Sequence, residues 1–369
     1  MGRPEVLTDF AAVEQLLPEW RALAGRSARS PLEAPDWQLP LARLYHARHS
    51  IRFLTWRHEG ELVAVAPFSL VTDRPRTRPL RQLAMWGTMG PRLRGLVDVV
   101  AVDEHRAQVL DGLCGWLRAG NEWDVMWIVR PQHGSPTPAR LRTEAAAAGW
   151  RYAAYANLRS TTYQLDLPDS AEGWQRHLDA KDRRTMRARS RRFAEFRAGQ
   201  VVPAVGQPEA TEALDAVERL LTQRWGEREV NFRAEPRFRP LIHDAVPRLV
   251  AQGGAWISVA RDDSGIVAGL VSLAQNGYAM SLMMAATPDA SYRQFSLGDQ
   301  IHHAAIGEAV GRGCHTYDLL WVGGYKETFW RARPHFLDSA VVGRGLVGRT
   351  AARLLARQLT ESETRSPRR

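Results

Sequence analysis

The sequence predicts an α/β protein of two lobes, each a mixed, mostly antiparallel β-sheet flanked by helices. Three apolar runs stand close together in the second half of the chain, at 256–261, 266–275 and 278–286. A helical segment and a further strand follow them, and part of this order recurs in the first half, at 56–68 and 120–127. Antiparallel strands, a helix and a closing strand make one compact unit, so the recurrence indicates two such units.

The unit in the second half begins with two predicted hairpins. Asp262-Asp263-Ser264-Gly265 and Asn276-Gly277 separate the apolar runs, and both are sequences that tight hairpin turns favour. A helix at 297–311 is expected next, entered through a small-residue turn at 296–298, and then a strand at 317–322. The free N–H groups and the dipole at such a helix start predict an anion site.

Apolar periodicity and turn residues place the other elements. In the first half we expect helices at 5–25, 37–46, 104–119 and 138–148, and strands at 52–57, 62–70, 125–129 and 161–167. In the second half we expect helices at 170–196, 209–227, 237–251 and 349–359, and a strand at 337–342.

The repeat sets the expected domains. The hairpin 56–68 matches 260–272, and the helix–strand junction before Trp127 matches the one before Trp321. The first copy ends in Arg130-Pro131, and because proline blocks an immediate helix, this copy is interpreted as a scaffold. The predicted domains are a degenerate N-terminal one at 1–166 and a working C-terminal one at 167–359, with a disordered tail at 360–369.

Composition indicates a globular chain without a membrane span. The 369 residues are 44% apolar and 24% charged, and no apolar run approaches the roughly 20 residues that cross a bilayer. The N-terminal sequence lacks the apolar core of a signal peptide, and Cys114 and Cys314 are expected to be buried thiols, so we expect a cytoplasmic protein. The net charge of +10 favours anionic ligands such as CoA, acidic substrates or RNA.

The segment around the turn at 296–298 resembles a known superfamily. The strand–strand–strand–loop–helix–strand order, with SLGDQI at the turn and YDLLWVGGYKETFW after it, is similar to the GNAT acyl-CoA N-acyltransferases. It looks most like the CelD/BcsL-type branch, whose members carry two GNAT-like halves, an architecture shared with the Fem-type aminoacyl transferases. The residues that carry the resemblance are Ser296, Gly298, Asp318, Gly323, Tyr325, Lys326 and Trp330.

The resemblance implies a site for acetyl-CoA or another acyl-CoA in the second half. Backbone N–H groups at the turn would hold the phosphates, with Arg293 beside them, and Met284 would line the slot for the thioester arm. The expected cofactor-binding residues are Arg293, Gln294, Phe295, Ser296, Leu297, Gly298, Asp299 and Met284. The alternative is an ordinary helix start, with Ser296 as its cap and Met284 as core.

The candidate catalytic residues are Tyr325, Lys326 and Asp318. A tyrosine hydroxyl just past the strand end could reprotonate a leaving thiolate, and a lysine could hold an oxyanion or a carboxylate. Asp318 could accept the amine proton. The structural alternatives stay open: a solvated lysine, a packing tyrosine and an aspartate that caps a turn.

Acceptor contacts are assigned by analogy alone, to Trp225, Arg224, Trp330 and Tyr292. His302 and His303 lie on the expected helix without further ligands at zinc spacing, so the sequence predicts no metal site.

A basic helix leaves a second function open. Seven cations lie between Lys181 and Arg192, distributed around the helix with few aromatic neighbours. Base-stacking modules carry more aromatic residues, but a tRNA or another polyanion could still bind. The sequence thus predicts an N-acyltransferase for the amine of a small-molecule, sugar or peptide acceptor. The alternatives are a Fem-type aminoacyl-tRNA-dependent transferase and a non-catalytic GNAT-like scaffold.

Overall fold

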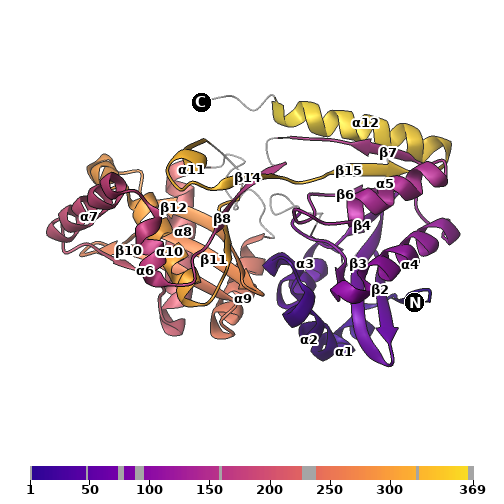
Figure 1. Ribbon diagram of the computed structural model, residues 1–369, viewed down its shortest axis with the longest axis horizontal. Coiled ribbons are helices and arrows are strands. Elements are labelled where there is room, and N and C mark those ends of the chain that lie inside the picture. The colour runs from indigo at the N-terminus through magenta and orange to yellow at the C-terminus, as the bar shows by residue number, and fades with distance from the viewer. Residues whose placement is uncertain are drawn as a thin grey trace. The chain divides into compact units, whose positions relative to one another are not determined.

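The chain folds into two α/β units, each built on its own mixed β-sheet (Figure 1). The computed structural model describes residues 2–46, 49–73, 79–87, 95–157, 160–226, 238–320 and 324–364. The first unit comprises Met1–Thr162 and His335–Arg369, and the second comprises Tyr163–Pro334. The predicted fold class, two helix-flanked and mostly antiparallel sheets, is confirmed.

The first sheet has the strand order β1-β2-β3-β4-β6-β15-β7, and β5 also pairs with β3. Of its pairs, β4 and β6 run parallel and the others are antiparallel. Its strands are β1 (Glu5–Leu7), β2 (Ser50–His58), β3 (Glu61–Asp73), β4 (Leu80–Met85), β5 (Val100–Ala101), β6 (Val125–Ile128), β7 (Arg151–Ala154) and β15 (Ala340–Gly343). The helices of this unit are α1 (Phe10–Gln15), α2 (Leu17–Ser27), α3 (Pro35–His46), α4 (Arg106–Ala119), α5 (Thr137–Ala147) and α12 (Gly345–Thr364), with short 3-10 turns η1 (Pro31–Glu33) and η2 (Asp103–His105).

The second sheet has the order β14-β8-β13-β12-β11-β10-β9. Here β12 and β13 run parallel, at the point that corresponds to β4 and β6 in the first sheet. Its strands are β8 (Thr161–Asp166), β9 (Gln200–Val202), β10 (Ala255–Asp262), β11 (Gly265–Gln275), β12 (Tyr278–Ala286), β13 (Thr316–Asp318) and β14 (Arg333–Phe336). Its helices are α6 (Ala171–His177), α7 (Ala180–Glu195), α8 (Gln207–Trp225), α9 (Phe238–Ala251), η4 (Ala290–Phe295), α10 (Leu297–Gly311) and α11 (Gly324–Thr328).

Alternate residues of β11 face opposite layers of helices, because side chains of a strand alternate between its two faces. Leu270 lies in one apolar cluster with Leu297 and Ile301 of α10. Gly269, the preceding residue, faces α8 so closely that a Cβ there would lie 2.4 Å from Val217 Cγ2. The second sheet is therefore covered on both faces, by α10 on one and by α8 on the other.

Each sheet takes in one strand from a distant part of the chain. β15, near the C-terminus, lies between β6 and β7 in the first sheet, and α12 packs along β15 and β7 (Figure 1). β8 lies between β13 and β14 in the second sheet. Residues 335–359, expected in the C-terminal domain, thus belong to the first unit, because their strand completes its sheet.

Most expected elements form, and a few differ for local reasons. The segment expected as a helix at 5–25 starts with strand β1, and α1 begins after Asp9, which accepts a hydrogen bond from Ala12 N. The helix expected at 170–196 is two helices, because Asp179 is extended and caps the start of α7. The strand expected at 317–322 ends at Asp318, and β14 was not anticipated. Helix α12 continues to Thr364, through half of the tail expected to be disordered.

Candidate active site

The turn into α10 has the form of an anion-binding site. Ser296 joins η4 to α10 in a left-handed conformation, with φ of 46°. Its carbonyl accepts hydrogen bonds from Asp299 N and Gln300 N, at 2.9 and 3.2 Å. Within the described residues, the N–H groups of Leu297 and Gly298 have no acceptor, so they are free for a ligand.

A pocket of about 340 Å³ opens at this turn. Four of the expected cofactor-binding residues line it, together with two expected acceptor contacts and the end of β12: Arg224, Ala286, Thr287, Pro288, Tyr292, Arg293, Ser296, Leu297 and Gly298. Arg293 is exposed and contributes positive charge, as Arg224 does from the last turn of α8. The structure therefore joins a cavity, two guanidinium groups and a helix N-terminus.

The other expected cofactor residues lie around the pocket without lining it. Phe295 is buried in the core with Leu297 and Ile301, so its side chain is not available to a ligand. Gln294 is exposed and donates to Ser291 O at 3.4 Å. Met284 packs beneath the turn, where its Cε would lie 3.6 Å from a Cβ built on Gly298.

Asp299 is turned toward two neighbours that offset its charge. Its carboxylate lies 3.8 Å from the Arg189 guanidinium of α7 and accepts a hydrogen bond from the Tyr325 hydroxyl. Burial nevertheless raises the pKa of Asp299 above its usual range, while Tyr325 and Arg189 act in the opposite direction. A carboxylate compensated in this way repels a neighbouring phosphate less than a free one would.

Tyr325 and Lys326 stand on α11, near this same turn. Tyr325 is 53% exposed, and burial of its hydroxyl together with the nearby Asp299 raises its pKa, so it keeps its proton at neutral pH. The Lys326 ammonium donates to Leu319 O and, at 3.4 Å, to Leu320 O. Desolvation lowers the pKa of Lys326 to about 8, although Asp318 acts to raise it. Lys326 is thus partly buried and hydrogen-bonded to the residues at the end of β13. Its lowered pKa also lets it gain and lose a proton near neutral pH.

Asp318 ends β13 and is fully buried. Its Oδ1 accepts from Leu320 N at 2.6 Å, and its Oδ2 accepts from the Tyr278 hydroxyl and from Gln164 Nε2. These bonds hold the residues after β13 in place, since Leu320 itself has a φ of 56°. The arrangement favours the structural alternative for Asp318, in which it caps the turn after β13 instead of accepting a proton.

His302, one turn into α10, contacts the pocket turn and is close enough to Lys326 for the lysine charge to affect its pKa. Its Nδ1 lies 2.8 Å from Gly298 O, and because a carbonyl can only accept, Nδ1 carries the proton. Desolvation and, to a smaller extent, the charge on Lys326 lower the pKa of His302 to about 4, although the hydrogen bond to Gly298 O acts to raise it. The imidazole is therefore neutral at neutral pH, and among the described residues no group hydrogen-bonds with its Nε2. Lys326 was named from the sequence, but its electrostatic effect on His302 depends on the tertiary structure.

Two of the residues expected to contact the acceptor have side chains that interact with other parts of the protein. Trp330 is 2% exposed and lies among Trp174, His302 and His303, so it belongs to the core and not to an acceptor surface. Tyr292 borders the pocket, but its hydroxyl donates to Asp262 Oδ2 at 2.6 Å. The side chain of Trp225 and residue Gly323 lie outside the described part of the chain.

The basic helix α7 shows charge on its exposed side. An ion pair joins Arg189 of α7 to Asp299 of α10. Four other arginines of α7 are exposed and have no acidic ion-pair partner within the described residues: Arg184, Arg187, Arg191 and Arg192. No helix among the described residues is long and apolar enough to cross a membrane.

Comparison with known protein families identifies a domain within the second unit. Residues 180–334 match the acetyltransferase (GNAT) domain. This match covers 155 residues (334 − 180 + 1), which make up most of the second unit. A search of curated proteins finds no match.

Three solved structures resemble the chain over almost its whole length. FemX has a TM-score of 0.60 at 11% identity, with 88% of this chain and 95% of that chain covered. The C-terminal domain of a putative lysylphosphatidylglycerol synthetase from Agrobacterium fabrum has a TM-score of 0.53 at 14% identity, with coverage of 94% and 96%. L-PGS from Bacillus licheniformis has a TM-score of 0.51 at 13% identity, with coverage of 99% and 98%. At these identities the likeness concerns the fold.

Proposed function

We propose that the protein is an N-acyltransferase that takes its acyl group from acyl-CoA, most simply acetyl-CoA, and transfers it to the amine of a small-molecule, sugar or peptide acceptor. The observation that carries the proposal is the pocket of about 340 Å³ at the first turn of α10. Free backbone N–H groups, the helix dipole and two arginines meet there, and this combination binds phosphate groups in proteins.

The residues at the turn fit the charged end of CoA. Gly298 leaves the backbone open to close approach, and the acidic side chain next to it, Asp299, is compensated by Arg189 and Tyr325. Bound acyl-CoA would supply the acyl thioester. The chain would hold its phosphates at Leu297 and Gly298 N–H, with Arg293 and Arg224 on the pocket wall.

The residues near the turn can move protons. Tyr325 keeps a hydroxyl proton that it can give to a leaving group, and His302 has an unprotonated Nε2 at neutral pH. Lys326, with a pKa of about 8, holds the strand end in position. An alkylammonium with a pKa of about 10 must lose a proton before it can attack the thioester. The unprotonated Nε2 of His302 is the nitrogen that we assign to accept it.

Calorimetric titration with acetyl-CoA tests the proposal, followed by measurement of thiol release in the presence of candidate amines. We expect micromolar binding in wild type and weaker binding in Arg293→Gln, because one phosphate partner is lost. A matched control is Arg312→Gln, which removes one arginine at the far end of α10. Absence of acetyl-CoA binding in the folded wild type would contradict the proposal.

A Fem-type aminoacyl-tRNA-dependent reaction is the second candidate. The exposed arginines of α7 and the similarity in fold to FemX support it. Polyanion binding should weaken steeply with salt, since bound cations are released from the nucleic acid. Filter binding of tRNA to wild type and to an Arg184→Gln/Arg187→Gln double variant separates the candidates. Tight, salt-sensitive binding without acetyl-CoA affinity would favour the tRNA donor.

A further inference from the structure

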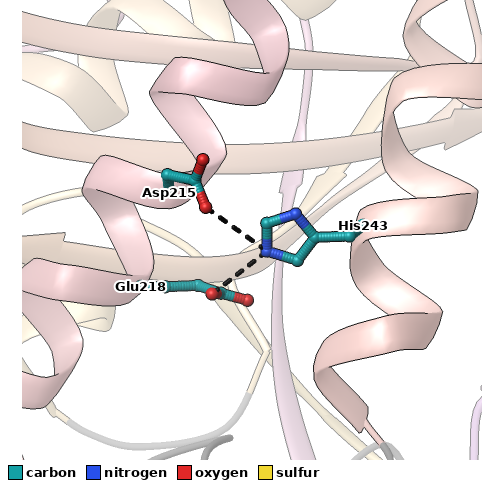
Figure 2. A group of neighbouring side chains, drawn as sticks. All are labelled: Asp215, Glu218 and His243. Atoms are coloured by element: carbon teal, nitrogen blue, oxygen red, sulfur yellow. Dashed lines mark ion pairs between the residues drawn. The ribbon is translucent and has the colours of Figure 1, made fainter.

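A cluster of one imidazole and two carboxylates lies between α8 and α9, away from the pocket turn. Asp215 and Glu218 stand three residues apart on α8, and His243 faces them from α9 (Figure 2). His243 Nε2 lies 3.1 Å from Glu218 Oε2 and 3.7 Å from Asp215 Oδ1. Three potential ligand atoms thus converge on one point from two helices.

The separations match those of a metal's coordination shell. A tetrahedral Zn²⁺ with bonds of about 2.0–2.1 Å to nitrogen and oxygen places neighbouring ligand atoms roughly 3.3–3.4 Å apart. The two distances from His243 Nε2 lie on either side of that value. Helical spacing of three residues aligns the two carboxylates on one face of α8, so no rearrangement of the helices is needed.

The nitrogen of His243 lacks a hydrogen bond that would explain its position. Nε2 is buried, and among the described residues no group hydrogen-bonds with it, although two carboxylate oxygens face it. A cation bound between Nε2 and the two carboxylates would give this buried nitrogen a partner and hold the three ligand atoms together. Glu218 is itself buried, so its charge also requires a cation.

Arg239 already provides one cation for this cluster. Its Nε lies 2.8 Å from Glu218 Oε2 and its terminal nitrogen 3.4 Å from Asp215 Oδ1, so it uses the same oxygens that a metal would. The Arg239 side chain is 51% exposed and can turn into solvent, and among the described residues no hydrogen bond joins it to His243 Nε2. Arg239 and a metal ion are therefore competitors for the two carboxylates.

We propose that Asp215, Glu218 and His243 form a Zn²⁺ site that joins α8 to α9. One imidazole and two carboxylates suit Zn²⁺ and similar transition metals better than Ca²⁺ or Mg²⁺, which prefer oxygen ligands alone. Three protein ligands leave a fourth position for water. The sequence predicts no metal site, because its ligands are separated by 25 positions (243 − 218) and only the packing of α8 against α9 unites them.

Calorimetric titration of the full chain with ZnCl₂ tests the site. We expect one equivalent to bind to wild type, and about tenfold weaker binding or worse in Glu218→Gln and in His243→Gln, each of which removes one ligand. Glu308→Gln, which removes the same charge from α10, serves as the matched control and should bind as wild type does. Arg239→Met should bind more tightly, because the competing cation is gone.

A spectroscopic measurement makes the test independent of the variants. Co²⁺ in place of Zn²⁺ should give wild type the intense visible absorption of a four-coordinate ion, and Zn²⁺ should displace it. Failure of both wild type and Arg239→Met to bind Zn²⁺ at about 100 µM would overturn the proposal. So would one equivalent bound equally well by wild type, Glu218→Gln and His243→Gln, because the ion would then lie elsewhere.

Discussion

The hydroxyl of Tyr325 donates a hydrogen bond to the carboxylate of Asp299, and this contact joins α11 to the first turn of α10. The two residues are 26 positions apart in the sequence (325 − 299). Through this contact α11 adjoins the turn that lines the pocket. It brings a phenol that stays protonated at neutral pH close to free backbone N–H groups.

Tyr325→Phe should lower turnover with little change in stability. The ring is half-exposed and stacks on Phe329, which phenylalanine preserves, but the proton donor is lost. We expect kcat to fall by about 10²-fold, within the range that general acid catalysis contributes. Steady-state kinetics and a melting curve on the same sample check this. A large fall in Tm without loss of kcat would make Tyr325 a packing residue.

Lys326→Ala should lower stability as well as activity. The ammonium donates to two backbone carbonyls at the end of β13, and its removal leaves them unsatisfied. The free energy of unfolding should fall by about 1–3 kcal/mol. Urea denaturation measures it, and Lys181→Ala, which removes the exposed lysine of α7, is the control that should stay near wild type.

Gly298→Val should weaken acetyl-CoA binding while Gly298→Ala retains it. A Cβ at Gly298 meets Met284 Cε at 3.6 Å, an ordinary contact, so alanine fits. Valine adds two further methyl groups at a position where Cβ already contacts Met284 and which lines the pocket. Titration calorimetry should give a dissociation constant raised about tenfold or more for valine alone. Equal affinities for the three proteins would move the phosphate site away from this turn.

His302 should make stability fall as the solution becomes acidic. Its pKa is about 4 in the folded protein and near 6.5 when unfolded, so between these values the unfolded chain binds more protons. The free energy of unfolding therefore decreases as pH falls from about 6.5 to 4. His302→Asn keeps a donor for Gly298 O but does not titrate, so its stability should depend less on pH in this window. Parallel pH slopes for both proteins would contradict the assignment.

The N-terminal half should not fold alone, because a strand from the C-terminal segment, β15, completes its sheet. A fragment of residues 1–162 lacks β15, which lies between β6 and β7. The edges of β6 and β7 would then be unpaired, so we expect a poorly folded, aggregating fragment. Circular dichroism and size-exclusion chromatography test this. The same fragment joined by a flexible linker to residues 335–364 should fold.

Local pattern predicted the elements on which the site depends. The hairpins at Asp262–Gly265 and Asn276-Gly277 form as expected, and α10 spans the expected 297–311. Their signals are short-range: alternating apolar residues, turn residues with positive φ such as Gly277, and a helix start after Ser296. The free N–H groups at the start of α10 follow from the same signals, because a helix N-terminus leaves them unbonded wherever it forms. The pocket beside them also needs Arg224 of α8 and the end of β12, which only the packing brings there.

The sequence by itself determined the fold class, the repeated α/β order and the position of the turn into α10, since each depends on neighbours within a few residues. Only the tertiary structure decided which sheet receives β8 and β15, that Lys326 holds the end of β13, and that Trp330 is core. It also decided that His243 meets Asp215 and Glu218. The physical reason is that these contacts join segments distant in the chain, and their free energy comes from pairing and packing that no local pattern encodes.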